Sequence, residues 1–156
     1  ITITDTITFN SITGELKEGN EIIKLNLKEL KLLKFFLQHP DVFTKVIALS
    51  GIYDARYFNH HQDYGNDEVV YQNSPADYIW NQHDDWFIDK YRQADIIVCT
   101  GLGDWEQDGL DSFYNLKRAF EEKNIPAWFD TWGTDVAHDW VWWRKQMPFF
   151  LHSIGL

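Results

Sequence analysis

The chain has 156 residues and a mass of 18.5 kDa, which predicts a single domain with a substantial hydrophobic core. Hydrophobic residues make up 44% of the chain and aromatic residues 17%, a composition that excludes a disordered or low-complexity protein. The net charge of −10 argues against nucleic acid and against an anionic membrane surface as partners, because both are bound through clusters of Lys and Arg.

Cysteine usage and hydropathy indicate the cellular setting. The single cysteine, Cys99, cannot form an internal disulfide. No apolar run reaches the roughly 18 residues of a membrane span, and no segment has the pattern of a signal peptide. We therefore expect a cytoplasmic protein in a reducing compartment.

The composition changes near residue 45. Residues 1–45 hold 6 Lys and 6 Asp or Glu, whereas residues 46–156 hold 8 Lys or Arg and 18 Asp or Glu. Every Trp and every Tyr also follows residue 45. This break predicts two parts of different character, residues 1–40 and 41–156, joined without a flexible linker.

The first part is typical of short β-strands followed by one helix. Strands are expected at residues 1–3, 6–9, 14–17 and 21–25. Gly19–Asn20 is a hairpin signal between the last two. Asn26 and Glu29 have the spacing of a helix capping box, and His39–Pro40 would end that helix.

The second part alternates strand and helix patterns. Apolar runs at residues 46–49, 95–99 and 127–131 predict buried strands, each followed by a glycine-containing turn. A helical pattern runs from Leu110 to Lys123–Asn124, and another begins at Trp140. The alternation predicts an α/β fold with three parallel strands and flanking helices.

The loops after these strands carry the candidate catalytic residues. In parallel sheets, ligands gather beyond the carboxyl ends of the strands. Asp104 and Glu106 follow the second strand, and His138 follows the third. A carboxylate that holds an imidazole in one tautomer is two thirds of a hydrolytic triad, and the chain order of acid before histidine fits an α/β-hydrolase.

Residues 41–156 resemble an esterase family of the α/β-hydrolases. The resemblance is carried by residues 46–54 (VIALSGIYD), 70–75 (VYQNSP), 101–106 (GLGDWE), 132–140 (WGTDVAHDW) and 143–146 (WRKQ). It implies carboxylester hydrolysis by a Ser-His-acid mechanism, with no cofactor and no metal. His138 would be the general base and Asp104 or Glu106 the orienting acid. The distance from the strand favours Asp104, and a shift of two residues would give Glu106.

The sequence departs from this family at the nucleophile. A Gly-x-Ser-x-Gly turn should lie about two dozen residues before Ser50, and 24 residues before Ser50 stands Asn26. Residues 25–28 (LNLK) supply neither a nucleophile nor the glycines of the turn. The loop with the second oxyanion donor is also missing. The chain alone is therefore predicted to be inactive and to need a serine from elsewhere.

Other side chains near the strand ends are expected to bind substrate. Ser50 is interpreted as a structural or substrate-contacting hydroxyl rather than a substitute nucleophile, because the turn around it lacks the first glycine. Trp105 and Trp140 belong to an aromatic rim that could stack on a small-molecule ester, an aromatic ligand or a sugar.

Residues 5–40 bear a weaker resemblance, to the opening strands and first helix of response-regulator winged-helix DNA-binding domains. It is carried by residues 7–10 (ITFN), 14–16 (GEL), 22–29 (IIKLNLKE) and 32–33 (LL). The recognition helix and wing would have to follow Pro40, where the esterase-like sequence begins instead. The resemblance implies a recombined, truncated or joined chain and disfavours DNA binding.

One alternative function remains open. The chain could be a non-catalytic ligand-binding or interaction protein that forms a homodimer through the free edge of strand 46–49. A metal site is disfavoured, because the adjacent His60 and His61 rarely converge on one ion. Asp63, Asp67 and Glu68 likewise miss the spacing of a calcium loop.

Overall fold

A computed structural model of the chain describes residues 7–10, 15–18, 21–24, 30–59 and 68–156. The first elements are three short strands, β1 (Ile7–Asn10), β2 (Glu15–Glu18) and β3 (Glu21–Lys24). They form a small antiparallel sheet in the order β1-β2-β3. Three of the expected short strands are thus confirmed, and the one expected at residues 1–3 lies outside the described residues. The Gly19–Asn20 turn and the Asn26–Glu29 capping box lie outside the described residues.

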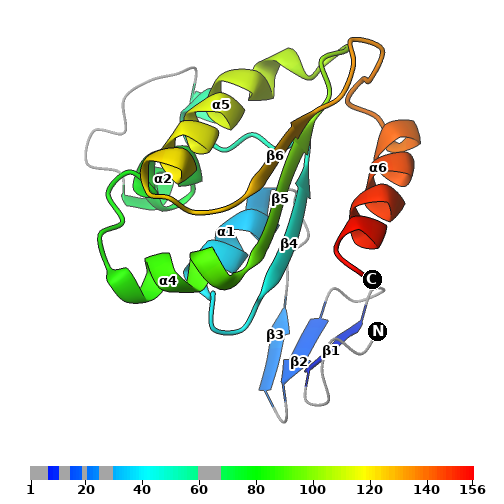
Figure 1. The fold of residues 1–156 in the computed structure, drawn as a ribbon. Coiled ribbons are helices and arrows are strands. Elements are labelled where there is room, and N and C mark those ends of the chain that lie inside the picture. The colour runs from blue at the N-terminus through cyan, green and yellow to red at the C-terminus, as the bar shows by residue number, and fades with distance from the viewer. Residues whose placement is uncertain (1–6, 11–14, 19–20, 25–29, 60–67) are drawn as a thin grey trace.

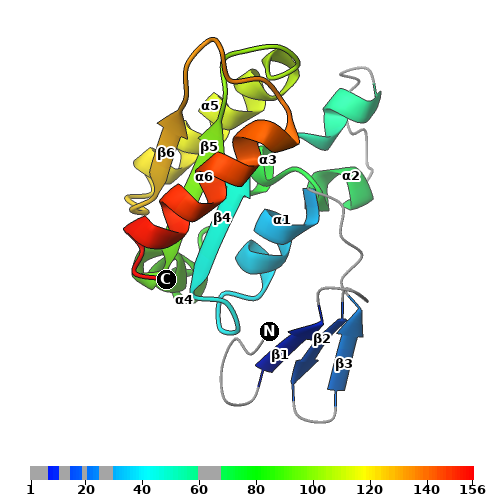
Figure 2. The same ribbon diagram turned by 90° about the vertical axis from the view of Figure 1, so that its right-hand side faces the viewer.

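The larger sheet contains three parallel strands, β4 (Lys45–Leu49), β5 (Asp95–Thr100) and β6 (Trp128–Thr131). Their order is β4-β5-β6, so β5 is central and β4 lies at one edge. This sheet is separate from the small sheet, which is drawn below it in Figures 1 and 2. The prediction of an α/β fold with three parallel strands is confirmed.

Helices cover both faces of the larger sheet. Their bounds are α1 (Leu30–Gln38), the 3-10 helix η1 (Ala55–Asn59), α2 (Glu68–Gln72), α3 (Pro75–Tyr78), α4 (Asp85–Gln93), α5 (Gln107–Glu122) and α6 (Trp140–Ser153). In Figure 1, α1, α4 and α5 lie on one face and α6 lies on the other. Figure 2 shows α6 in front of the sheet. The helices α2 to α4 were not predicted from the sequence.

Successive residues of each strand point to opposite faces of the larger sheet, so the strands contribute to two hydrophobic cores. Val46, Ile96 and Val98 point to the face covered by several helices and join the main hydrophobic cluster. Ile97 and Cys99 point to the opposite face, where they pack with Phe150 of α6. The α6 face therefore depends on far fewer buried side chains than the main face.

The helix α1 packs as part of the larger unit. Leu33, Phe36 and Leu37 recur at helical spacing, are 2% exposed or less, and belong to the main cluster. The composition break between residues 40 and 45 therefore does not coincide with a break in packing. Within the described residues, no helix is both long and apolar enough to cross a membrane.

Candidate functional site

The candidate site lies where β4, β5 and β6 end. Ser50 follows β4, the loop with Asp104 and Glu106 follows β5, and the loop with His138 leads from β6 into α6. Because the three strands are parallel, these loops meet at the same edge of the sheet.

Two glycines allow the loop after β5 to approach the loop after β6 closely. A Cβ atom on Gly101 would stand 2.1 Å from the carbonyl oxygen of Val136, and one on Gly103 would stand 2.7 Å from it. The Gly103 N–H instead donates a hydrogen bond of 2.9 Å to this oxygen. The contact between the loops therefore requires the glycine residues of the predicted 101–106 motif.

Glu106 is buried in this contact although it carries a carboxyl group. Its residue is 2% exposed and stands at the N-cap position of α5, where the helix dipole favours a negative charge. The preceding residue, Trp105, has φ of 66°, a left-handed conformation that is uncommon for a bulky residue. This turn leaves the Trp105 side chain 79% exposed and directs the chain into the buried position of Glu106.

The Glu106 carboxylate has three polar neighbours. Ser50 Oγ donates a 2.6 Å hydrogen bond to Oε1, and Thr100 Oγ1 donates one of 3.0 Å to Oε2. His138 Nδ1 lies 3.6 Å from the same Oε2. The two hydroxyl groups thus satisfy the buried charge and hold one oxygen beside the imidazole.

The structure brings Glu106, rather than Asp104, to His138. The side chain of Asp104 is exposed, and this residue contacts His138 through its backbone: the His138 N–H donates a 2.9 Å hydrogen bond to the Asp104 carbonyl oxygen. Asp104 therefore anchors the histidine backbone while Glu106 faces the ring. The count of residues from the strand end, which favoured Asp104, did not anticipate the left-handed turn at Trp105.

Ser50 is a buried hydroxyl and not a free nucleophile. It is 5% exposed, and its Oγ both donates to Glu106 and accepts a 3.0 Å hydrogen bond from Trp143 Nε1. The other serines of the described residues, Ser74, Ser112 and Ser153, each donate to a backbone carbonyl oxygen. Within the described residues, no serine hydroxyl is available to His138.

Cys99 does not supply an alternative nucleophile. It is fully buried in β5, and burial raises the pKa of its thiol well above the ordinary value. The thiolate that a nucleophilic cysteine needs is therefore disfavoured at neutral pH.

The two tryptophans of the predicted aromatic rim differ in position: Trp105 is exposed to solvent away from the groove described here, whereas Trp140 lines it. Trp140 is 65% exposed and stacks edge-to-face on Trp143 with ring centroids 5.1 Å apart. Both tryptophans line a groove of about 400 Å³ between β4 and α6, together with Ile47, Ala48, Leu49, Arg144 and Met147. Trp105, another residue of the predicted rim, does not line this groove.

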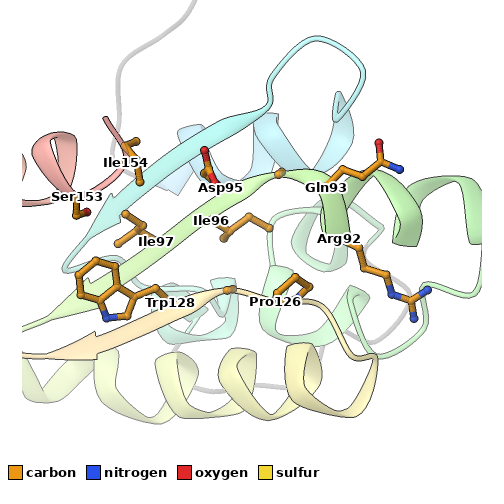
Figure 3. A pocket seen from close by; sticks show the side chains of 11 residues that line it. Arg92, Gln93, Asp95, Ile96, Ile97, Pro126, Trp128, Ser153 and Ile154 are labelled. Atoms are coloured by element: carbon orange, nitrogen blue, oxygen red, sulfur yellow. The ribbon is translucent and has the colours of Figure 1, made fainter. Parts of the chain in front are cut away.

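A second hollow lies far from this chemistry. It has a volume of about 550 Å³ and lies at the amino ends of β5 and β6, near Asp95, Pro126 and Ile154 (Figure 3). His138 and Glu106 lie at the opposite ends of these strands. This hollow is therefore no part of the candidate site.

No group of His, Cys, Asp and Glu residues suited to a metal ion exists in the described part of the chain. The histidines and acids weighed for metal binding at residues 60–67 lie outside the described residues.

Two contributors to the site were not foreseen from the sequence. They are Thr100, the last residue of β5, and Trp143 of α6. Trp143 lies edge-to-face against His138 with ring centroids 4.9 Å apart, and it donates to Ser50. Its place three residues after Trp140, on the same helix face, was the available signal.

Comparisons with known proteins support the fold alone. No family model matches the chain. No curated protein matches it either. A solved structure described as a ferulic acid esterase is similar at a TM-score of 0.57 and 22% sequence identity. The match covers 76% of this chain and 43% of the esterase, so the chain spans less than half of that protein. The chain thus has a partial, esterase-like α/β fold.

Proposed function

We propose that the chain carries the acid–base pair of a carboxylester hydrolase, with His138 as general base and Glu106 as the carboxylate that orients it. The observation that carries the proposal is the position of Glu106 Oε2, 3.6 Å from His138 Nδ1 at the carboxyl ends of the parallel strands. A carboxylate beside Nδ1 favours the tautomer whose other nitrogen, Nε2, can accept a proton.

The environment of Glu106 suits this role. Its burial keeps water from competing for the carboxylate, and hydrogen bonds from Ser50 and Thr100 leave Oε2 directed at the imidazole. The His138 side chain is 30% exposed, so a substrate can reach the ring. Two residues next to Glu106 have a left-handed backbone: Ser50, which is hydrogen-bonded to it, and Trp105, which precedes it in the chain. Such backbone strain is often found at functional sites.

The described residues do not supply a nucleophile to this pair. All serine hydroxyls of the described residues are engaged elsewhere, and Asn26 lies outside these residues. We therefore expect the chain alone to give no stoichiometric adduct with a fluorophosphonate probe by intact-mass analysis. An adduct on Ser50 that disappears in His138→Ala would overturn this part of the proposal.

The base itself can be tested with an added nucleophile. Hydroxylamine attacks p-nitrophenyl acetate to form a hydroxamate and release nitrophenol, and a positioned general base that removes its proton accelerates such an attack by about 100-fold or more. We expect hydroxamate formation to be faster with the wild-type chain than with His138→Ala. His152→Ala, at the other end of α6, is the matched control. Equal rates for the wild type and His138→Ala would contradict the proposal.

A second candidate function is non-catalytic ligand binding. It is favoured by the groove of about 400 Å³ beside Trp140 and Trp143, which has the apolar lining typical of small-molecule sites. A small aromatic ester or a sugar would quench or shift tryptophan fluorescence on binding. Trp140→Ala should move the midpoint of this response to a higher ligand concentration, and Trp86→Ala, a half-exposed tryptophan on α4, should leave the midpoint unchanged. An unchanged midpoint in Trp140→Ala would remove the groove as the binding site.

The homodimer remains a proposal as well. It rests on β4, which pairs only with β5 among the described strands and so leaves one edge of the larger sheet unpaired. Light scattering across a concentration series should then show a dimer, and a monomeric mass at high concentration would contradict it.

A further inference from the structure

One side chain, Trp143, contacts His138 directly and is linked to Glu106 through Ser50. Its ring packs edge-to-face on the His138 imidazole at a centroid distance of 4.9 Å. Its Nε1 lies 3.0 Å from Ser50 Oγ, and Ser50 Oγ lies 2.6 Å from Glu106 Oε1. The four side chains therefore form a closed ring of contacts, since Glu106 Oε2 returns to His138 Nδ1.

The direction of the hydrogen bonds in this ring follows from chemistry. An indole N–H can only donate, so Trp143 donates to Ser50 Oγ. A serine hydroxyl has one proton, and a carboxylate only accepts, so the Ser50 proton goes to Glu106. The distance of 2.6 Å is that of a strong O–H···O⁻ bond. Trp143 thus fixes the orientation of the hydroxyl that holds the carboxylate.

We propose that Trp143 is a positioning residue that acts through Ser50 to hold Glu106 against His138 and so keeps the imidazole proton on Nδ1. The inference rests on the proposed function, because a proton on Nδ1 leaves Nε2 as the proton acceptor. It goes beyond that function by assigning roles to Ser50 and Trp143, two residues outside the acid–base pair.

The backbone of Ser50 supports this assignment. Its φ is 52°, in the left-handed region where glycine is the usual residue. Its N–H donates a 2.7 Å hydrogen bond to the Cys99 carbonyl oxygen, which fixes the residue at the end of β4. A non-glycine residue at this position, whose hydroxyl both donates and accepts a hydrogen bond, fits a role for that hydroxyl.

The experiment measures the tautomer of His138 by imidazole ¹⁵N NMR, at a pH high enough that the ¹⁵N shifts no longer change and the ring is neutral. The Nδ1–H form should predominate in the wild type. Trp143→Phe keeps an aromatic ring against His138 and removes only the indole donor, and we expect it to lower the ratio of Nδ1–H to Nε2–H about threefold, the effect of losing one modest hydrogen bond.

Ser50→Gly suits the left-handed backbone and removes the hydroxyl, so it should lower the same ratio. The double variant Ser50→Gly/Trp143→Phe should show the ratio of Ser50→Gly alone, because the effect of Trp143 passes through Ser50. The matched control is Trp142→Phe, the next residue on α6, whose ring contacts Lys145 instead. It should leave the ratio unchanged.

The proposal is overturned if Trp143→Phe leaves the ratio unchanged, or if its effect adds in full to that of Ser50→Gly. The second result would assign the effect to direct ring contact. Should Trp143→Phe fail to fold, benzothienylalanine at position 143 replaces only the N–H by sulfur and carries the same expectation. The tautomer does not depend on turnover, so it can shift as expected even if the hydroxamate assay shows no catalysis by His138.

Discussion

Glu106 Oε2 and His138 Nδ1 lie 3.6 Å apart, although their residues come from loops after different strands. The carboxylate is 2% exposed, whereas the histidine side chain is 30% exposed. The pair therefore joins a buried, hydrogen-bonded anion to a ring that solvent can reach. With this arrangement, the buried carboxylate can fix the orientation of the imidazole while the ring stays accessible.

We expect Glu106→Gln to lower the free energy of unfolding by about 1–3 kcal/mol. The glutamine side chain keeps the shape of glutamate but offers only one acceptor oxygen to the two hydroxyl donors, Ser50 and Thr100. Asp104→Asn changes an exposed side chain and should stay within about 0.5 kcal/mol of the wild type. Urea unfolding measures both variants, and equal effects would contradict the assignment of Glu106 as the buried acid.

The end of α5 offers a test of backbone conformation. Asn124 has φ of 52°, its N–H donates to the Glu121 carbonyl, and the Ile125 N–H donates to the Phe120 carbonyl. This is the hydrogen-bond pattern of a Schellman motif, in which glycine is preferred at the left-handed position. Asn124→Gly should raise the free energy of unfolding by about 0.5 kcal/mol, and Asn124→Ala should lower it by about 1 kcal/mol. Thermal unfolding should rank the three proteins accordingly, and a more stable alanine variant would refute the argument.

Phe150 anchors the thinner core of the molecule. It is fully buried and packs edge-to-face on Trp128 at 5.1 Å, in the cluster with Ile97 and Cys99. Phe150→Ala should cost about 3–5 kcal/mol, because the cluster has few other buried members. Its neighbour Phe149 is 49% exposed, so Phe149→Ala should cost far less. Denaturant unfolding compares the two, with Phe150→Leu as a milder change if the alanine variant does not fold.

Much of the fold could be predicted because its signals are local. The runs at residues 46–49, 95–99 and 127–131 became β4, β5 and β6 within about one residue. The expected burial holds for most of the central strand β5 but was wrong for β6, in which no residue is buried, because β6 lies at an edge of the sheet. The end of α5 at Lys123–Asn124 was also predicted. The short helices α2 and α3 were missed, because segments of five and four residues contain too few turns to show a period.

Only part of the candidate site could be predicted, because the choice of the acid depends on the path of a loop in three dimensions. The sequence identified His138 and two carboxylates, but the choice between Asp104 and Glu106 depends on how the loop turns. That turn passes through Trp105 in a left-handed conformation, for which a tryptophan gives no sequence signal. The contact of Trp143 with Ser50 spans 93 positions and depends on how α6 packs on the sheet, which no local pattern encodes.

The buried thiol of Cys99 predicts a pH dependence of stability. Burial raises the pKa of this thiol in the folded protein above its value of about 8.5 in the unfolded chain. The unfolded state therefore loses its proton first, and stability falls as the pH rises above the unfolded value. Between pH 7.5 and 9.5 the free energy of unfolding should fall by about 1 kcal/mol more in the wild type than in Cys99→Ala. Urea unfolding across this range measures the difference, in which contributions from tyrosines and lysines cancel. A thiol that reacts with iodoacetamide equally fast in the folded and the urea-unfolded protein would contradict the burial on which this prediction rests.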